Sequence, residues 1–269
     1  MGDIIIQNGK TFSVINVTDT HTHLPVANYL LQYDEMKDVF SLEVQSDFTI
    51  PEKIYGDFSY TERWKKSFEN TKKNLGILLS GYKGNGKTFT AQYFCKLMNK
   101  PVIFITRGYK GVSFESFITN PIFHESVIFI DEYEKLYNDN NDNEDSLLSI
   151  MDGLYTTHMI FLLTVNDSRE ISDKLKNRLG RIKYHKQYSL IEPSVIEDTI
   201  ADLLVNKEHE KSLRDVLDVI PTISLDILMS LIKEMNLFDE PANECVKHLN
   251  IVKEESYFEV TISKGSERK

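Results

Sequence analysis

The chain has few of the residues and patterns that mark secreted or membrane proteins. Only two of its 269 residues are cysteines, Cys95 and Cys245. The first ten residues lack a basic segment followed by a long apolar one, so no secretory signal is expected. No apolar run approaches the roughly 20 residues that a membrane-spanning helix needs. These absences predict reduced thiols, no membrane partner and a cytoplasmic location.

Proline and glycine are also scarce, with 7 and 12 residues, while 41% of the chain is hydrophobic and 27% is charged. This composition is typical of a globular protein and excludes a disordered or fibrous chain. Basic residues are outnumbered by acidic ones, and the net charge is −10. An acidic total argues against broad nonspecific binding to nucleic acid or anionic membranes. It does not exclude a local basic lining in a ring-shaped assembly.

The most informative pattern that is present is GYKGNGKT at residues 81–88, which follows an apolar run and precedes a helical stretch. Glycines at fixed positions let successive backbone N–H groups point at a triphosphate, and Lys87 adds a positive charge for the β- and γ-phosphates. Thr88 supplies a hydroxyl for Mg²⁺. The pattern predicts that ATP is held by Gly81, Gly84, Asn85, Gly86, Lys87, Thr88 and Phe89.

A second pattern places two acids directly after an apolar run, at Asp131 and Glu132. On a parallel sheet this puts both carboxylates at the carboxyl edge of a strand, beside the phosphate loop. Asp131 is expected to hold Mg²⁺ through water. Glu132 is expected to polarise the attacking water, because phosphoryl transfer needs a positioned nucleophile more than covalent help.

From residue 75 onward, short apolar runs alternate with helical stretches, which is typical of a parallel sheet with crossover helices. Five strands are expected in an α/β, doubly wound domain of the phosphate-loop type. Their predicted bounds are Gly76–Ser80, Val102–Thr106, Val127–Ile130, Met159–Val165 and Ile182–Tyr188.

The two ends of the chain differ from this central part. Residues 1–50 are β-rich and irregular, and a helix from about Tyr60 to Lys73 precedes the phosphate-loop strand. After residue 190, apolar residues recur at three-and-four spacing, which predicts helices. We therefore expect an N-terminal β element (1–50), a nucleotide-binding α/β domain (51–190) and a helical lid (191–269) with a short last strand at Tyr257–Ile262.

Three further segments resemble the second region of homology of AAA proteins, a group within the AAA+ ATPases. They are Leu147–Leu154, Ile160–Asn166 and Leu175–Arg181, and the resemblance covers about residues 50–237. It implies that Asn166 is the polar sensor that orients the lytic water or contacts the γ-phosphate. It also implies that Arg178 is an arginine finger for the neighbouring subunit's site, and that Arg181 is the second arginine of the family's R-x-G-R pattern. A guanidinium supplied in this way neutralises charge on the γ-phosphoryl group.

Two shorter segments carry weaker resemblances. Tyr109, Lys110 and a following glycine look like the first pore loop of AAA+ translocases, in which an aromatic residue grips an extended polypeptide, although an ordinary turn explains the pattern nearly as well. Lys110 is equally suited to a nucleic-acid backbone. Ile54 and Tyr55 lie in a segment that resembles the part of the family that surrounds the adenine base.

Together these features predict an AAA-type ATPase that hydrolyses Mg-ATP at the subunit interfaces of a homo-oligomeric ring, most simply a hexamer, and remodels or threads a protein substrate. A chain with so little beyond its motor core resembles compact AAA proteins, including virus-encoded ones. Leu179 stands where the narrower AAA group usually has proline. The clade therefore stays open, and so does a replication accessory, helicase-like or clamp-loader-like, that acts on nucleic acid. A regulatory nucleotide-binding module without turnover is a third alternative.

Overall fold

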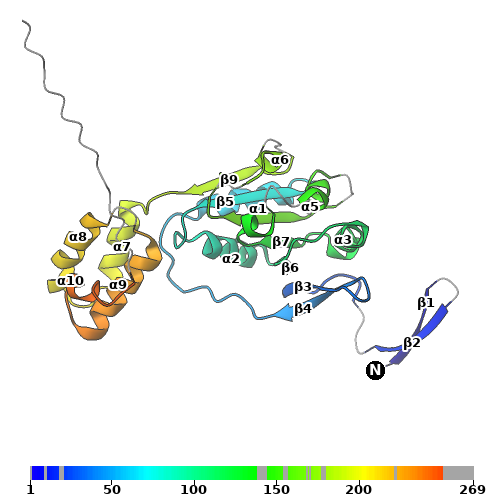
Figure 1. Cartoon of the computed structure of the whole chain (residues 1–269), viewed down its shortest axis with the longest axis horizontal. Helices are drawn as coiled ribbons and strands as arrows, with labels where there is room; N and C mark the ends of the chain where they lie inside the picture. The colour runs from blue at the N-terminus through cyan, green and yellow to red at the C-terminus, as the bar shows by residue number, and fades with distance from the viewer. Residues whose placement is uncertain are drawn as a thin grey trace, which may run out of the picture. The chain divides into compact units, whose positions relative to one another are not determined.

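Seven strands form one sheet in the order β4-β3-β6-β7-β8-β5-β9, in which only β3 and β4 are antiparallel neighbours (Figure 1). The structure, a computed structural model, describes residues 2–8, 11–17, 21–137, 144–153, 157–167, 169, 171–176, 180–220 and 223–250. The strands are β3 (Asn28–Asp34), β4 (Val39–Gln45), β5 (Leu75–Gly81), β6 (Val102–Phe104), β7 (Val127–Ile130), β8 (Ile160–Val165) and β9 (Tyr184–Tyr188).

The sheet is larger than the sequence predicted. The strands β5 to β9 lie where five strands were expected, and β3 and β4 extend the same sheet at its edge instead of forming an element apart from it. The extension depends on parallel pairing of Asn28–Leu30 with Val102–Phe104. This pairing joins segments about 70 positions apart, so no local pattern in the sequence reveals it.

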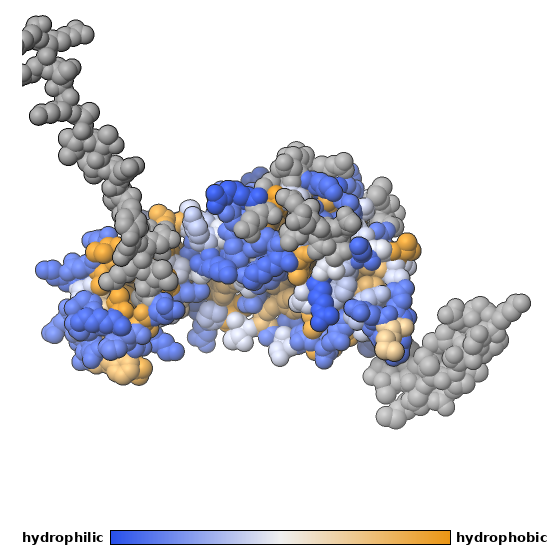
Figure 2. Space-filling view, viewed as in Figure 1, coloured by the Kyte–Doolittle hydropathy of each residue, from blue (hydrophilic) through white to orange (hydrophobic). Residues whose placement is uncertain are grey.

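Helices cover both faces of the sheet, because alternate residues of its central strands are buried on opposite sides. On one face, Ile77 and Leu79 of β5 pack with α1 (Ser59–Glu69) and α2 (Lys87–Met98). On the other face, Leu78 packs with α3 (Val112–Ile118), α4 (Tyr133–Leu136), α5 (Glu144–Met151) and α6 (Asp173–Lys176). On the face shown in Figure 2, hydrophilic residues cover much of this part of the molecule.

The chain divides into two compact units between Ser189 and Leu190. The first also contains a two-stranded antiparallel sheet, β1 (Gly2–Asn8) with β2 (Thr11–Val17), in which Gly2 lies opposite Val17. This hairpin lies within residues 1–50, the segment that the sequence predicted to be β-rich.

The second unit is helical in its described part, with its own apolar core. Its helices are α7 (Pro193–Leu203), α8 (Glu210–Val219), α9 (Leu225–Phe238) and α10 (Ala242–Cys245). Proline opens α7, and the Ser224 hydroxyl accepts a hydrogen bond from the Ile227 N–H at the start of α9, two common ways to begin a helix. The predicted last strand, Tyr257–Ile262, lies outside the described residues.

In the central parallel strands, the carboxyl ends meet at one edge of the sheet, where ligands bind in open α/β folds. The segments that follow β5, β7 and β8 are the phosphate loop, the acid pair and Asn166. The topology therefore brings together three motifs that are separated in the sequence. In the described part of the chain, no helix is long and apolar enough to cross a membrane.

Candidate functional site

The phosphate loop lies between β5 and α2, and two of its glycines occupy positions that favour glycine. Gly81 has a φ of +136°, and a Cβ there would lie 2.0 Å from the Tyr188 carbonyl oxygen. Gly86 has a φ of +83° and caps the start of α2. A positive φ of this kind is costly for residues with a side chain. The first N–H groups of α2 have no partner within the helix, so they are available to an anion.

Lys87 is held at the mouth of this loop and is only 6% exposed. Its ammonium donates to the carbonyl oxygens of Gly81 at 2.6 Å and Tyr82 at 2.9 Å, and to Asn166 Oδ1 at 3.1 Å. Burial lowers the pKa of Lys87, while the nearby carboxylates of Glu134, Asp131 and Glu132 act to raise it. The cation is therefore kept among neutral oxygens, close to where the loop would receive phosphates.

Asp131 is in contact with the threonine that was predicted to share a metal ion with it. The Thr88 hydroxyl donates to Asp131 Oδ1 at 3.0 Å, and the Thr164 hydroxyl donates to the same oxygen at 2.5 Å. A hydroxyl and a carboxylate side by side suit Mg²⁺, which takes oxygen ligands and keeps several waters. With the ammonium and the helix start, this donor set fits a magnesium–triphosphate group.

Glu132 is placed by a strained backbone. Its φ is +53°, in the left-handed region that costs a non-glycine residue roughly 1–2 kcal/mol. The Glu132 N–H donates to the Thr164 hydroxyl at 2.9 Å, which anchors this conformation. Strain of this kind concentrates where a side chain must be aimed. Here it directs the Glu132 carboxylate toward Asn166.

The Glu132 carboxylate already has partners. It pairs with Lys135, accepts a hydrogen bond from Asn166 Nδ2 at 3.0 Å, and lies 3.8 Å from Lys83 Nζ. The hydrogen bond from Lys135 is the largest cause that lowers the pKa of Glu132, followed by the one from Asn166. The side chain is nevertheless 34% exposed. Glu132 is thus an accessible carboxylate that must exchange these partners before it can act on a water.

Asn166 connects the predicted residues with one that sequence reasoning missed. Its amide contacts Lys87, Glu132 and Glu134, the last at 2.9 Å. Thr164 was missed as well. It is the polar residue within the apolar strand β8, two positions before Asn166, and this placement was a usable signal. Glu134, the other missed residue, had a weaker signal in the sequence, namely an acidic residue two positions after Glu132.

Of the two predicted arginines, Arg178 and Arg181, the structure describes only Arg181. Arg178 lies outside the described residues, and its role stays a prediction. Arg181 is only 9% exposed, and its guanidinium forms a bidentate ion pair with Asp152 at 2.8 and 2.7 Å. It also donates to the Lys174 carbonyl oxygen. A guanidinium held in this way is directed at Asp152, which favours a structural role for Arg181, and its contact with a neighbouring subunit's nucleotide stays a prediction.

We expect Arg181→Ala to lower the free energy of unfolding by about 3 kcal/mol, because it removes the buried guanidinium that binds the Asp152 carboxylate with two hydrogen bonds. Denaturant unfolding monitored by circular dichroism measures this loss. Arg169→Ala is the matched control, since Arg169 pairs with Asp167 but its side chain is 89% exposed, and such pairs contribute about 1 kcal/mol or less. Unchanged stability together with lost ATP turnover would return Arg181 to the catalytic set.

The structure places Tyr109 in surroundings that differ from those expected of a pore loop. Its side chain is 9% exposed and packs edge-on against Phe40 of β4, with 5.2 Å between ring centroids. Its hydroxyl donates to the Leu31 carbonyl oxygen at 3.4 Å. Tyr109 is therefore part of the core beneath the β3–β4 hairpin and does not present a ring to a polypeptide. Lys110 beside it is exposed.

The predicted adenine contacts, Ile54 and Tyr55, are half-buried, and Lys53 Nζ lies 5.8 Å from the centre of the Tyr55 ring. A different aromatic residue reaches the helix that follows the phosphate loop. Phe58 packs edge-on against Phe89, with 5.8 Å between ring centroids. Phe58 is thus an apolar neighbour of the loop that the sequence did not single out. Asn85 contributes differently, since its Nδ2 donates to the Ser189 carbonyl oxygen at 2.6 Å.

Residues 77–187 match the family described as "ATPase family associated with various cellular activities (AAA)". The match begins in β5 and ends in β9, so it includes the phosphate loop, the acid pair and Asn166. A comparison with curated proteins gives no match.

Proposed function

We propose that this chain hydrolyses Mg-ATP at the interfaces of a homo-oligomeric ring and uses the cycle to remodel a protein substrate. The match of residues 77–187 to the AAA ATPase family supports the hydrolysis of ATP. One observation carries the proposal. Asn166 joins the phosphate-loop lysine to the glutamate of the acid pair, through contacts of 3.1 and 3.0 Å. A cation for the phosphates, a general base and an orienting amide thus occupy one edge of the sheet.

The roles of these residues follow from the chemistry of phosphoryl transfer, which depends on positioning and on neutralising charge. Lys87 exchanges its carbonyl partners for phosphate oxygens. Thr88 and Asp131 hold Mg²⁺, directly and through water, and the ion balances the charge of the triphosphate. Glu132 exchanges Lys135 for the attacking water and accepts its proton, while the amide of Asn166 orients that water.

The ring is proposed because charge develops on the γ-phosphoryl group, and the AAA resemblance supplies a cation for it from a second subunit at Arg178. Because the Tyr109 side chain is buried, we do not assign it a contact with the protein substrate, and the proposed remodelling does not depend on it. Light scattering with and without ATP tests assembly, and Mg²⁺-dependent phosphate release tests hydrolysis. A monomer that releases phosphate would retain the ATPase and exclude the ring.

A second candidate function, action on nucleic acid, is favoured by one basic cluster. It consists of Arg63 and Lys66 of α1, Lys183 just before β9 and Lys186 within β9. The Lys183 ammonium donates to the Ser67 hydroxyl, and Lys186 Nζ lies 4.7 Å from the centre of the Tyr60 ring, so both belong to one α1–β9 surface. Cations beside aromatic rings are suited to a phosphate backbone.

If nucleic acid is the substrate, single- or double-stranded DNA should stimulate ATP turnover at low salt, and the stimulation should fall steeply as salt rises. Lys183→Ala with Lys186→Ala should then weaken it several-fold. Lys211→Ala with Lys233→Ala is the charge-matched control, because both lysines are exposed on the helical unit. Turnover that is insensitive to DNA at low salt would exclude this candidate and leave protein remodelling.

A further inference from the structure

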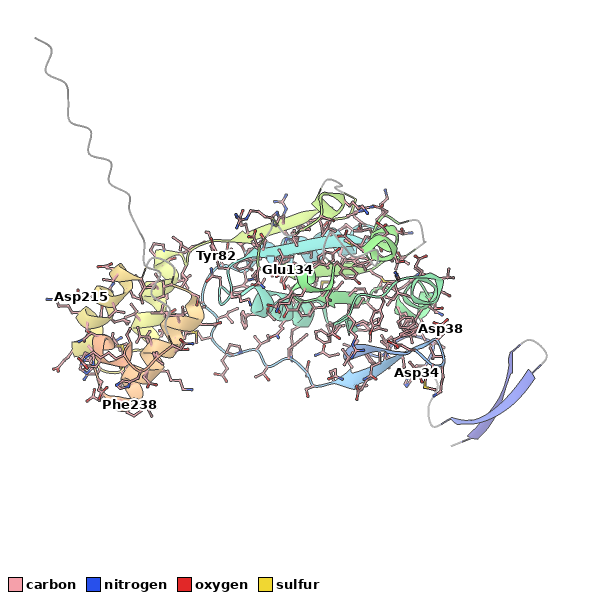
Figure 3. The ribbon with its side chains drawn as sticks, in the orientation of Figure 1. Asp34, Asp38, Tyr82, Glu134, Asp215 and Phe238 are labelled. Atoms are coloured by element: carbon pink, nitrogen blue, oxygen red, sulfur yellow. The ribbon has the colours of Figure 1, made fainter. Side chains whose placement is uncertain are left out.

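Glu134 is a buried carboxylate in the candidate site, and the chemistry described so far gives it no role. It lies in α4, two residues after Glu132, and is 8% exposed. Figure 3 shows it at the same end of the sheet as Tyr82 of the phosphate loop. Its Oε2 is buried without a hydrogen-bond partner among the described residues. A charge in such a place is expensive unless it is paired, so its presence requires an explanation.

The other oxygen of Glu134 binds Asn166 twice. Glu134 Oε1 accepts the Asn166 backbone N–H at 3.0 Å and the side-chain Nδ2 at 2.9 Å. Two bonds from one residue to one acceptor restrict both the backbone and the side-chain torsion of Asn166. Glu134 is therefore placed to fix where the Asn166 amide points.

The orientation of that amide follows from its surroundings. Its Oδ1 faces the Lys87 ammonium, while its two Nδ2 hydrogens face the carboxylates of Glu134 and Glu132. The reverse assignment would set an acceptor against two carboxylates and donors against a cation. Of the two carboxylates, Glu134 is buried and holds Asn166 twice, whereas Glu132 is partly exposed and holds it once. Glu132 is thus the partner that can leave.

We propose that Glu134 is a positioning residue that holds one amide hydrogen of Asn166, so that the second hydrogen stays directed at the place where Glu132 and the attacking water act. The inference rests on the proposed ATP hydrolysis. When Glu132 turns to the water, the freed amide hydrogen of Asn166 faces that water and the γ-phosphate. Without Glu134 the Asn166 amide can rotate, and its Nδ2 hydrogen is then no longer directed at the attacking water during hydrolysis.

Glu134→Ala should lower kcat about 30-fold, since small misplacements of catalytic groups have effects of this order. KM and the Kd of a fluorescent ATP analogue should change less than about three-fold, because Glu134 acts on the step that follows binding. Glu134→Gln should keep kcat within about three-fold of wild type, since its Oε1 still accepts from Asn166. Glu69→Ala, an exposed acid on α1, is the control.

A double-mutant cycle separates positioning from a general structural effect. Once Asn166→Ala has removed the amide, adding Glu134→Ala should change kcat less than about two-fold, because both act through one contact. If Glu134→Ala lowers kcat as much in the Asn166→Ala background as it does in the wild type, the proposal is overturned. If Glu134→Ala does not fold, Glu134→Asp serves instead, because its shorter carboxylate cannot keep both bonds to Asn166. Full activity of that variant would also overturn it.

Phosphate release by the wild type and by two variants distinguishes the role of Glu134 from the proposed ATPase activity. Wild-type protein that releases no phosphate contradicts the ATPase itself. Wild-type turnover that is abolished by Glu132→Gln but unaffected by Glu134→Ala contradicts only the role of Glu134.

Discussion

Glu132→Gln is expected to stop ATP turnover and leave ATP binding intact. The glutamine side chain has the same size and keeps one oxygen that accepts from Asn166 Nδ2, while its NH₂ group replaces the oxygen that accepts from Lys135, so that ion pair is lost. It cannot accept a proton from water at neutral pH. Loss of a general base typically costs about 10²- to 10⁴-fold in rate, and we expect a fall of kcat within that range.

The measurement is phosphate release at saturating ATP, together with the Kd of a fluorescent ATP analogue. Glu69→Gln is the matched control, because it makes the same chemical change at an exposed position on α1. If ring assembly requires bound ATP, the Glu132→Gln variant should also accumulate as rings, since the bound nucleotide persists. Turnover at the wild-type rate would remove Glu132 from its proposed role.

The same contacts predict the pH dependence of the reaction. Hydrogen bonds from Lys135 and Asn166 lower the pKa of Glu132 below its ordinary value. A group with a lowered pKa stays ionised until the pH falls well into the acid range, so Glu132 remains a carboxylate between about pH 6 and 8. The turnover rate should therefore show no loss from Glu132 protonation in that interval. A decline of kcat below about pH 7 would have to come from another group.

The predicted site residues that the structure brings close together share one property. The phosphate loop, Asp131, Glu132 and Asn166 each follow the end of an apolar run, and parallel pairing brings such ends to one edge of a sheet. A local pattern and a general rule of topology were together enough to place them close to one another.

Two predicted site residues have surroundings that the sequence did not indicate, because these surroundings depend on contacts between distant segments. Arg181 fits a motif for a nucleotide contact, yet Asp152, 29 positions earlier, binds its guanidinium. Tyr109 fits a loop motif, yet Phe40 covers its ring because the β3–β4 hairpin joins the main sheet. A motif gives the type and spacing of residues, and it cannot show which distant partner buries a side chain.

Mixing two inactive variants, Lys87→Ala and Arg178→Ala, is expected to restore part of the ATP turnover if the sites lie between subunits of a ring. Lys87→Ala should abolish turnover, because it removes the ammonium that lies at the mouth of the phosphate loop, and Arg178→Ala should abolish it by removing the proposed finger. When the two inactive variants are mixed, some interfaces combine an intact Lys87 from one subunit with an intact Arg178 from its neighbour. At equal amounts, random assembly gives about a quarter of the interfaces such a complete set.

Recovered activity should therefore be greatest near equal mixing and should fall toward either pure variant. A mixture of Lys87→Ala with Glu132→Gln is the control. Lys87 and Glu132 both contact Asn166 within one chain, so they belong to one subunit's half of the site, and no arrangement of these two variants completes it. Recovery in the first mixture and none in the second would assign Arg178 to the neighbouring subunit. Absence of recovery at every ratio, in samples shown by mass measurement to contain mixed rings, would mean that each chain completes its own site.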